Sequence, residues 1–118
     1  MKQLIAKLFN LLGWLVFVEQ QLCDVVACRI RNGHRRIVCS EAERSTRNLI
    51  RNVIRDFSRG CDTVLIVVPD EALRGAVFRK LKRELPQQVR RKVAVVTIGR
   101  IENTIRRLET IHSVGDVR

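Results

Sequence analysis

Aromatic residues are scarce in this chain, which has no tyrosine, four phenylalanines and one tryptophan. Proteins that bind single-stranded nucleic acid usually stack the bases on exposed aromatic side chains, so the composition gives little support to that class.

Long apolar runs are also missing. The apolar start of the chain is interrupted by Lys7, Asn10 and Gly13, whereas a membrane-spanning helix needs about 20 predominantly apolar residues. We therefore expect a cytoplasmic protein with a buried first helix and no membrane partner.

Cysteine pairs with the spacing of a zinc site are absent as well. The four cysteines stand at positions 23, 28, 39 and 61, and none of them forms a C-x-x-C pair. A structural zinc ion is therefore weakly supported. Three of the cysteines lie in or beside apolar runs, and we expect them to be reduced and buried thiols.

Acidic residues are few compared with basic ones. The chain has 12 Asp and Glu against 23 Lys and Arg, a net charge of +11, and Arg outnumbers Lys 18 to 5. Because the planar guanidinium group matches phosphate oxygens, this bias indicates an anionic polymer as a partner. An ordinary basic surface is the alternative.

With 118 residues, 46% of them hydrophobic, the chain can form one core, and we predict one domain over residues 1–112 with a flexible tail at 113–118.

Hydrophobic periodicity predicts the order of the secondary-structure elements. Apolar residues recur at helical spacing in four segments: residues 3–12, 45–60, 69–85 and 100–111. Short runs rich in β-branched residues predict five strands: residues 14–20, 23–30, 35–43, 63–68 and 92–98. The predicted fold class is α/β, a mixed β-sheet with an antiparallel three-strand meander followed by α-β-α-β-α and helices on both faces.

Three acidic residues are placed symmetrically about one predicted turn. Asn32 and Gly33 separate two strands, and Asn-Gly is the strongest short signal for a hairpin. With these residues at the turn, Asp24 faces Glu41 on one sheet face, and Glu43 lies one diagonal step away. Facing like charges destabilise a strand pair, and Mg²⁺ bound by one or two carboxylates would offset that. A solvated strand end, or pairing of the acids with nearby arginines, is the alternative.

The same residues resemble the motif of the PD-(D/E)XK nuclease superfamily. An acid at the start of one strand, a hairpin, and E-x-E on the next strand, followed by a helix and a further strand, are similar to that family's restriction-endonuclease-like core over residues 2–68. The resemblance implies a metal-dependent DNA phosphodiesterase, with Asp24 and Glu41 holding Mg²⁺ or Mn²⁺ and with Glu43 as a third catalytic position. Glu43 stands where the family usually has lysine, and the acid that the first helix often contributes is missing.

The predicted helix at 45–60 carries cations that could contact nucleic acid. Arg47, Arg51 and Arg55 are spaced by four residues, and Asn48 lies beside them, so a phosphate backbone would relieve their mutual repulsion. A solvated helix face is the alternative. Duplex DNA is the expected partner, and a homodimer that contacts both strands remains open. Two other functions also remain open: a nuclease-like module without catalysis that binds nucleic acid or assembles with a partner, and an unrelated α/β protein that binds an acidic protein surface.

Overall fold

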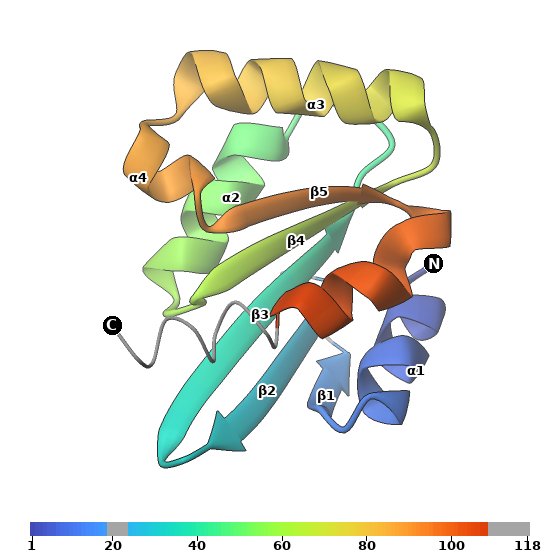
Figure 1. Ribbon diagram of the computed structural model, residues 1–118. Coiled ribbons are helices and arrows are strands. Elements are labelled where there is room, and N and C mark those ends of the chain that lie inside the picture. Colours follow the sequence, from blue (N-terminus) through green and yellow to red (C-terminus); the bar gives the residue numbers. More distant parts are fainter. Residues whose placement is uncertain (19–23, 109–118) are drawn as a thin grey trace.

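The computed structural model describes residues 1–18 and 24–108 of the chain (Figure 1). The helices are α1 (Lys2–Leu11), α2 (Leu49–Ser58), α3 (Glu71–Glu84), the short α4 (Gln87–Arg90), the 3₁₀ turn η1 (Ile98–Arg100) and a last helical segment at 101–108. The strands are β1 (Leu15–Val18), β2 (Val25–Arg31), β3 (His34–Ala42), β4 (Thr63–Val68) and β5 (Val93–Thr97). The predicted tail at 113–118 lies outside the described residues.

The five strands form one mixed sheet in the order β1-β2-β3-β4-β5. Strand β2 runs antiparallel to both β1 and β3, whereas β3, β4 and β5 run parallel to one another. The predicted meander, followed by strands that alternate with helices, is therefore confirmed. The apolar run TVLIVV forms the central strand β4, and all six of its residues are buried, as expected for a strand covered on both faces.

Helices cover both faces of the sheet, as Figure 1 shows. On one face, α1 and residues 101–108 share a core with strands β2 to β5, in which the largest buried side chains include Ile5, Phe9, Val25, Leu65, Ile101 and Ile105. On the other face, α2 and α3 pack on β4 around Leu49, Val53, Val64, Ile66, Val77 and Leu81. Alternate residues of β4 supply the two cores, because successive side chains of a strand point to opposite faces.

The start of α2 differs from the prediction. Helix α2 begins at Leu49 rather than at residue 45, since the hydroxyl of Ser45 accepts a bond from the amide of Arg47 (3.3 Å) and so closes a local turn instead of capping the helix. Asp70 caps α3, and its Oδ1 accepts a hydrogen bond from the amide of Leu73 at 2.8 Å. Strand β5 is only half-buried, because it lies at the edge of the sheet.

The prediction of reduced thiols is wrong for two of the cysteines. Cys39 of β3 and Cys61, just before β4, form a disulfide. Both residues are buried and pack with Val26 and Ile37 in a small apolar cluster. The parallel pairing of β3 with β4 explains this contact, because Val38 pairs with Thr63 and so brings the two cysteines to one place in the sheet. Cys28 of β2 carries a free, half-buried thiol.

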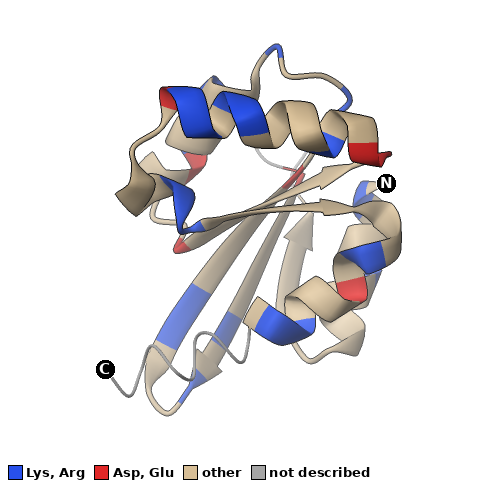
Figure 2. Ribbon diagram, turned by 45° about the horizontal axis from the view of Figure 1, so that its top comes forward, with Lys and Arg blue, Asp and Glu red and all other residues tan. Residues whose placement is uncertain are grey.

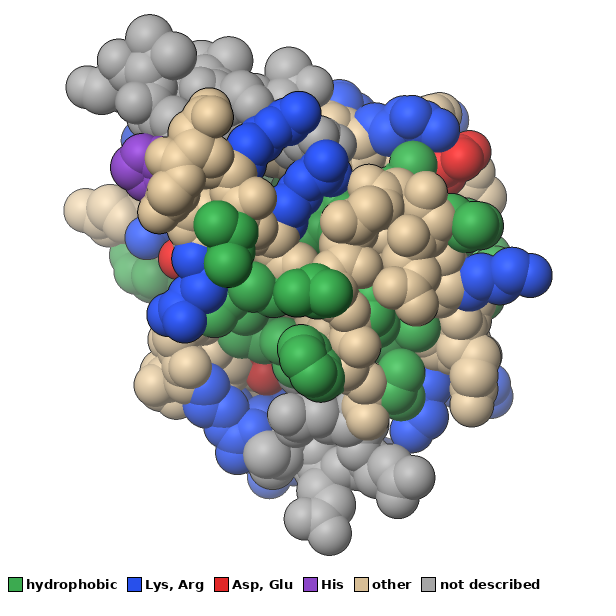
Figure 3. Space-filling view, turned by 90° about the horizontal axis from the view of Figure 1, so that it is seen from below, with side chains coloured by type: hydrophobic (Ala, Val, Ile, Leu, Met, Phe, Trp, Pro, Cys, Tyr) green, Lys and Arg blue, Asp and Glu red, His purple; other side chains and the backbone are tan. Residues whose placement is uncertain are grey.

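Charged and apolar side chains are unevenly distributed over the surface. Figure 2 shows Lys and Arg at the hairpin end of β2 and β3 and along α3. Large apolar side chains are exposed around β1 and the hairpin, among them Leu11, Leu15, Phe17 and Ile30, and Figure 3 shows a face where hydrophobic side chains gather with Lys and Arg around them. Among the described residues, no helix has the length and apolar character that crossing a membrane requires.

Candidate functional site

The hairpin between β2 and β3 has the turn and the register that the sequence predicts. Asn32 and Gly33 both have positive φ angles, 53° and 78°, as a type I′ turn requires. Strand pairing runs from Arg31 opposite His34 to Val25 opposite Ser40. Asp24 therefore lies one residue beyond the last pair, next to the end of β3 that carries Glu41.

Asp24 and Glu43 are both fixed by contacts to backbone or side-chain donors. One carboxylate oxygen of Asp24, Oδ2, accepts a hydrogen bond from the amide of Ala42 at 2.6 Å. The Oε1 atom of Glu43 accepts from Nδ2 of Asn52, which lies on α2, at 2.8 Å. Burial raises the pKa of Glu43, and the negative charge of Asp24 adds to that increase. The three predicted acids thus gather at one end of β3, beneath helix α2.

Glu41 is the most strongly perturbed acid of this group. Its side chain lies between β3 and α2, and the residue is only 4% exposed. Burial, followed by the hydrogen bond to Asp56 and that residue's charge, raises the pKa of Glu41 to about 9, while Arg55 acts in the opposite direction. The guanidinium Nη2 of Arg55 lies 3.3 Å from Oε2 of Glu41. At neutral pH the Glu41 carboxyl therefore holds a proton.

Asp56 is a fourth acid of the site, and the sequence analysis did not identify it. It is fully buried on α2, and burial raises its pKa as well. Its carboxyl group hydrogen-bonds to that of Glu41, and Nε of Arg55 lies 3.6 Å from Oδ1. The sequence does indicate that Asp56 is buried. It lies seven residues after Leu49 and three after Val53, which is a core position of the amphipathic helix.

The predicted nucleic-acid contacts on α2 do not form a single helical face. Arg47 and Asn48 precede the first turn of α2 and are exposed. Arg51 is exposed in the first turn and donates to Oδ1 of Asn48 at 2.8 Å. Arg55 points instead to the acids, with its side chain 28% exposed. Arg55 therefore differs in position from Arg47 and Arg51, because the buried carboxyl groups of Glu41 and Asp56 attract its guanidinium.

A cavity of about 310 Å³ opens at the carboxyl ends of β3 and β4, and Glu43 is the one acid of the group that lines it. Glu43 and Arg44 line it together with Met1, Ala42, Val67, Pro69 and Ile98. In open sheets with parallel strands, ligands bind preferentially beyond the carboxyl ends of the strands. The position of this cavity is therefore suitable for a substrate group that approaches Glu43.

The carboxylates have the chemistry of a site for a hard cation. All of their donor atoms are oxygens, which Mg²⁺ and Mn²⁺ prefer. Within residues 1–18 and 24–108, no three His, Cys, Asp or Glu side chains converge closely enough to hold a metal ion by themselves. An ion held here would therefore take one or two carboxylates and complete its coordination with water and phosphate oxygens.

Comparison with protein-family models, with curated proteins and with solved structures finds no match to this chain.

Proposed function

We propose that the chain is a metal-dependent phosphodiesterase that cleaves DNA, with Asp24, Glu41 and Glu43 at the reaction centre. The observation that carries the proposal is the buried Glu41, whose pKa is raised to about 9 by burial and by the neighbouring Asp56. Acids with a strongly perturbed pKa are typical of functional sites, and Glu43, whose pKa is also raised, lines the cavity at the end of β3. The meander followed by α2 and β4 also supports the resemblance to the PD-(D/E)XK nucleases that the sequence motif suggests.

Asp24 and Glu41 are the residues that would hold Mg²⁺ or Mn²⁺. Bound there, the ion would lower the pKa of a water molecule and stabilise the charge that develops on the phosphate. The amide of Ala42 fixes one oxygen of Asp24, so its other oxygen is available to the ion. Ionised Glu41 would be favoured by the positive charge of the ion, since an opposite charge nearby stabilises the charged form of a carboxyl group.

Glu43 and Arg55 would complete the site around the phosphate. Glu43, oriented by its bond from Asn52, would orient the attacking water or bind a second ion. Arg55 is the cation next to Glu41, and we assign to it the positive charge that lysine supplies in the resembling family. Arg47, Arg51 and Asn48 lie on the surface at the start of α2, where they would contact the DNA backbone.

Plasmid cleavage in the presence of Mn²⁺ tests this proposal. The parent protein should nick or linearise plasmid DNA, and Asp24→Ala and Glu41→Ala should each slow cleavage by roughly a hundredfold or more, as loss of a group that stabilises the transition state does. Glu102→Gln, which alters an exposed acid on the last helix, is the control and should cleave like the parent. Cleavage that survives in both alanine variants, or none in the parent, would overturn the enzyme assignment.

A catalytically inactive module that binds nucleic acid or assembles with a partner is the second candidate. Two observations favour it: Glu43 replaces the expected lysine, and the guanidinium of Arg55 already lies against the Glu41 carboxyl group, with Nη2 3.3 Å from Oε2. Binding of Mn²⁺ that Glu41→Ala abolishes, without any cleavage by the parent, would favour this module. Glu43→Lys would then be the variant to test for recovered activity. If the parent does not bind Mn²⁺ at all, both metal-dependent functions are excluded.

A further inference from the structure

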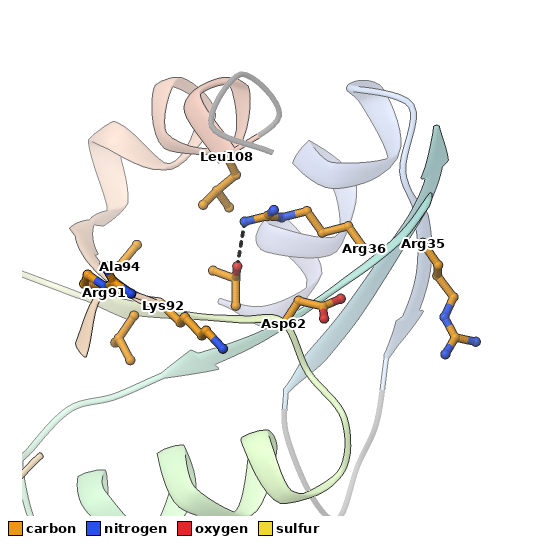
Figure 4. Close-up of a pocket in the computed structure, with 9 residues that line it drawn as sticks. Arg35, Arg36, Asp62, Arg91, Lys92, Ala94 and Leu108 are labelled. Carbon is orange, nitrogen blue, oxygen red and sulfur yellow. Dashed lines mark hydrogen bonds between the residues drawn. The ribbon is translucent and has the colours of Figure 1, made fainter. Parts of the chain in front are cut away.

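A second cleft, of about 490 Å³, lies at the opposite end of the sheet from the acids (Figure 4). Its floor includes Thr63 and Val93, the first residues of β4 and β5. Glu41 pairs with Ile66, three residues further along β4, which corresponds to about 10 Å along the strand. Thr63 also points to the sheet face that α1 covers, whereas Glu41 points to the face of α2. The cleft and the acid site are therefore separate.

Four cationic residues line this cleft against one acid: Arg35, Arg36, Arg91 and Lys92 against Asp62. Arg36 reaches into the cleft and donates from Nη2 to the Thr63 hydroxyl at 2.9 Å, and Figure 4 shows it directed below Leu108, while Arg35 points away. The acid is already engaged, because Oδ2 of Asp62 accepts a bond from the amide of Ile37 at 2.7 Å. The lining therefore has an excess of positive charge.

The backbone around Arg91 and Lys92 is held in place before β5 begins. The amide of Arg91 donates to the carbonyl of Gln87, and the carbonyl of Lys92 accepts from the amide of Val64, each at 3.0 Å. Both residues are exposed, and within the described part of the chain their side chains make no hydrogen bond or ion pair. The exposed charges of Arg91 and Lys92, which have no counter-ion among the described residues, add positive potential to this concave surface.

We propose that this cleft binds a phosphate group, separately from the acid site. The forked donors of arginine match phosphate oxygens, and lysine adds a point charge. The volume lies in the range of small-ligand sites, so it accommodates either one backbone phosphate of nucleic acid or the phosphate of a small metabolite. The proposal does not depend on metal binding or cleavage, and metal-free measurements test it independently of the proposed function.

Two metal-free measurements on the full chain identify the phosphate group and its source. The first follows backbone amide signals by NMR during titration with inorganic phosphate, and we expect shifts at Thr63, Lys92 and Val93. The second measures binding of a labelled DNA duplex of about 20 base pairs at several salt concentrations. The salt slope is the slope of the logarithm of the binding constant against the logarithm of the salt concentration, and each phosphate contact contributes about one unit to it.

The test variant is Arg91→Glu with Lys92→Glu. Its control is Arg79→Glu with Arg83→Glu, which makes the same change in net charge at two exposed positions of α3. We expect the cleft variant to lose the phosphate-induced shifts and to bind the duplex at least about tenfold more weakly than the control, with a salt slope lower by about two. If the reversed charges prevent folding, Arg91→Gln with Lys92→Gln replaces the variant.

Each outcome decides the proposal. Loss of phosphate shifts together with a selective loss of duplex affinity supports a nucleic-acid backbone as the ligand, and so does a selective loss of duplex affinity without measurable shifts. Phosphate shifts at the cleft, with equal duplex affinity in variant and control, identify the phosphate of a small molecule. Absence of shifts at the cleft, together with equal duplex affinity in variant and control, would overturn the proposal.

Discussion

Strand β3 passes two charged regions that differ in both sign and exposure. At its carboxyl end, Glu41 is 4% exposed and lies against Asp56, which is fully buried. At its hairpin end, Arg35 is exposed, and Arg91 and Lys92 add exposed cations from the segment before β5. The acids thus lie under a helix, whereas the cations surround an open cleft.

The difference shows how burial changes what a group of like charges does. Exposed cations are solvated and screened by salt, so their mutual repulsion has little effect on folding. Buried carboxyl groups cannot be solvated, and they respond by taking up protons, as the raised pKa of Glu41 indicates. We therefore expect the acid site to control how stability depends on pH, and the basic cleft to control how binding depends on salt.

The largest expected effect is the pH dependence that Glu41 confers on stability. Its pKa is about 9 in the folded chain, compared with an ordinary value of 4.5. The folded chain thus holds a proton that the unfolded chain releases, and the free energy of unfolding should fall as pH rises from about 4.5 to about 9. Each tenfold change in proton affinity is worth about 1.4 kcal/mol, so the decrease should be on the order of several kcal/mol.

Glu41→Gln, which cannot ionise, should remove this dependence. In urea unfolding, the free energy of unfolding of the variant should be close to that of the parent at about pH 5. At about pH 8.5 it should be higher than that of the parent, because the raised pKa makes the parent lose stability as pH rises. Glu102→Gln, at an exposed residue of the last helix, should change stability by less than about 0.5 kcal/mol at either pH. If the difference in the free energy of unfolding between the parent and Glu41→Gln stays constant over this pH range, the electrostatic account of the acid site is contradicted.

A smaller effect is expected from Arg55, the cation of the acid site. Arg55→Met keeps the apolar part of the side chain but removes the guanidinium from Glu41 and Asp56. Because the side chain is 28% exposed, the loss should be about 1–3 kcal/mol, below that for a fully buried pair. Arg51→Met, one turn earlier on α2, should lose less than about 0.5 kcal/mol in the same urea unfolding experiment. Equal losses in the two variants would show that the ion pair does not stabilise the fold.

The sequence predicts the fold well where the pattern is local or strongly periodic. Asn32-Gly33 predicts both the turn and the register of the hairpin, because only a few residue types adopt two consecutive positive φ angles. The uninterrupted apolar run of β4 predicts burial on both faces. The disulfide between Cys39 and Cys61 could not be predicted, since it depends on the parallel pairing of β3 with β4, a contact between residues 22 positions apart.

The candidate site is predicted only in part, for a related reason. Asp24, Glu41 and Glu43 come from one hairpin, so their proximity follows from its register. Asp56 and the orientation of Arg55 depend on how α2 packs on the sheet, and helical spacing alone makes Arg55 equivalent to Arg51. The basic cleft combines the start of β3 with the segment before β5, which no local pattern connects.

The smallest expected effect on stability is at the basic cleft. Arg91→Gln with Lys92→Gln removes two exposed cations that form no ion pair among the described residues. At low salt the variant should be equal to the parent or more stable by up to about 0.5 kcal/mol, because repulsion with the neighbouring arginines is relieved. In about 1 M salt, where the Debye length is about 3 Å, the difference should vanish. Urea unfolding at the two salt concentrations measures both values. A loss above about 1 kcal/mol would instead mean that these cations stabilise the fold, and the contrast between the two ends of β3 would then not hold.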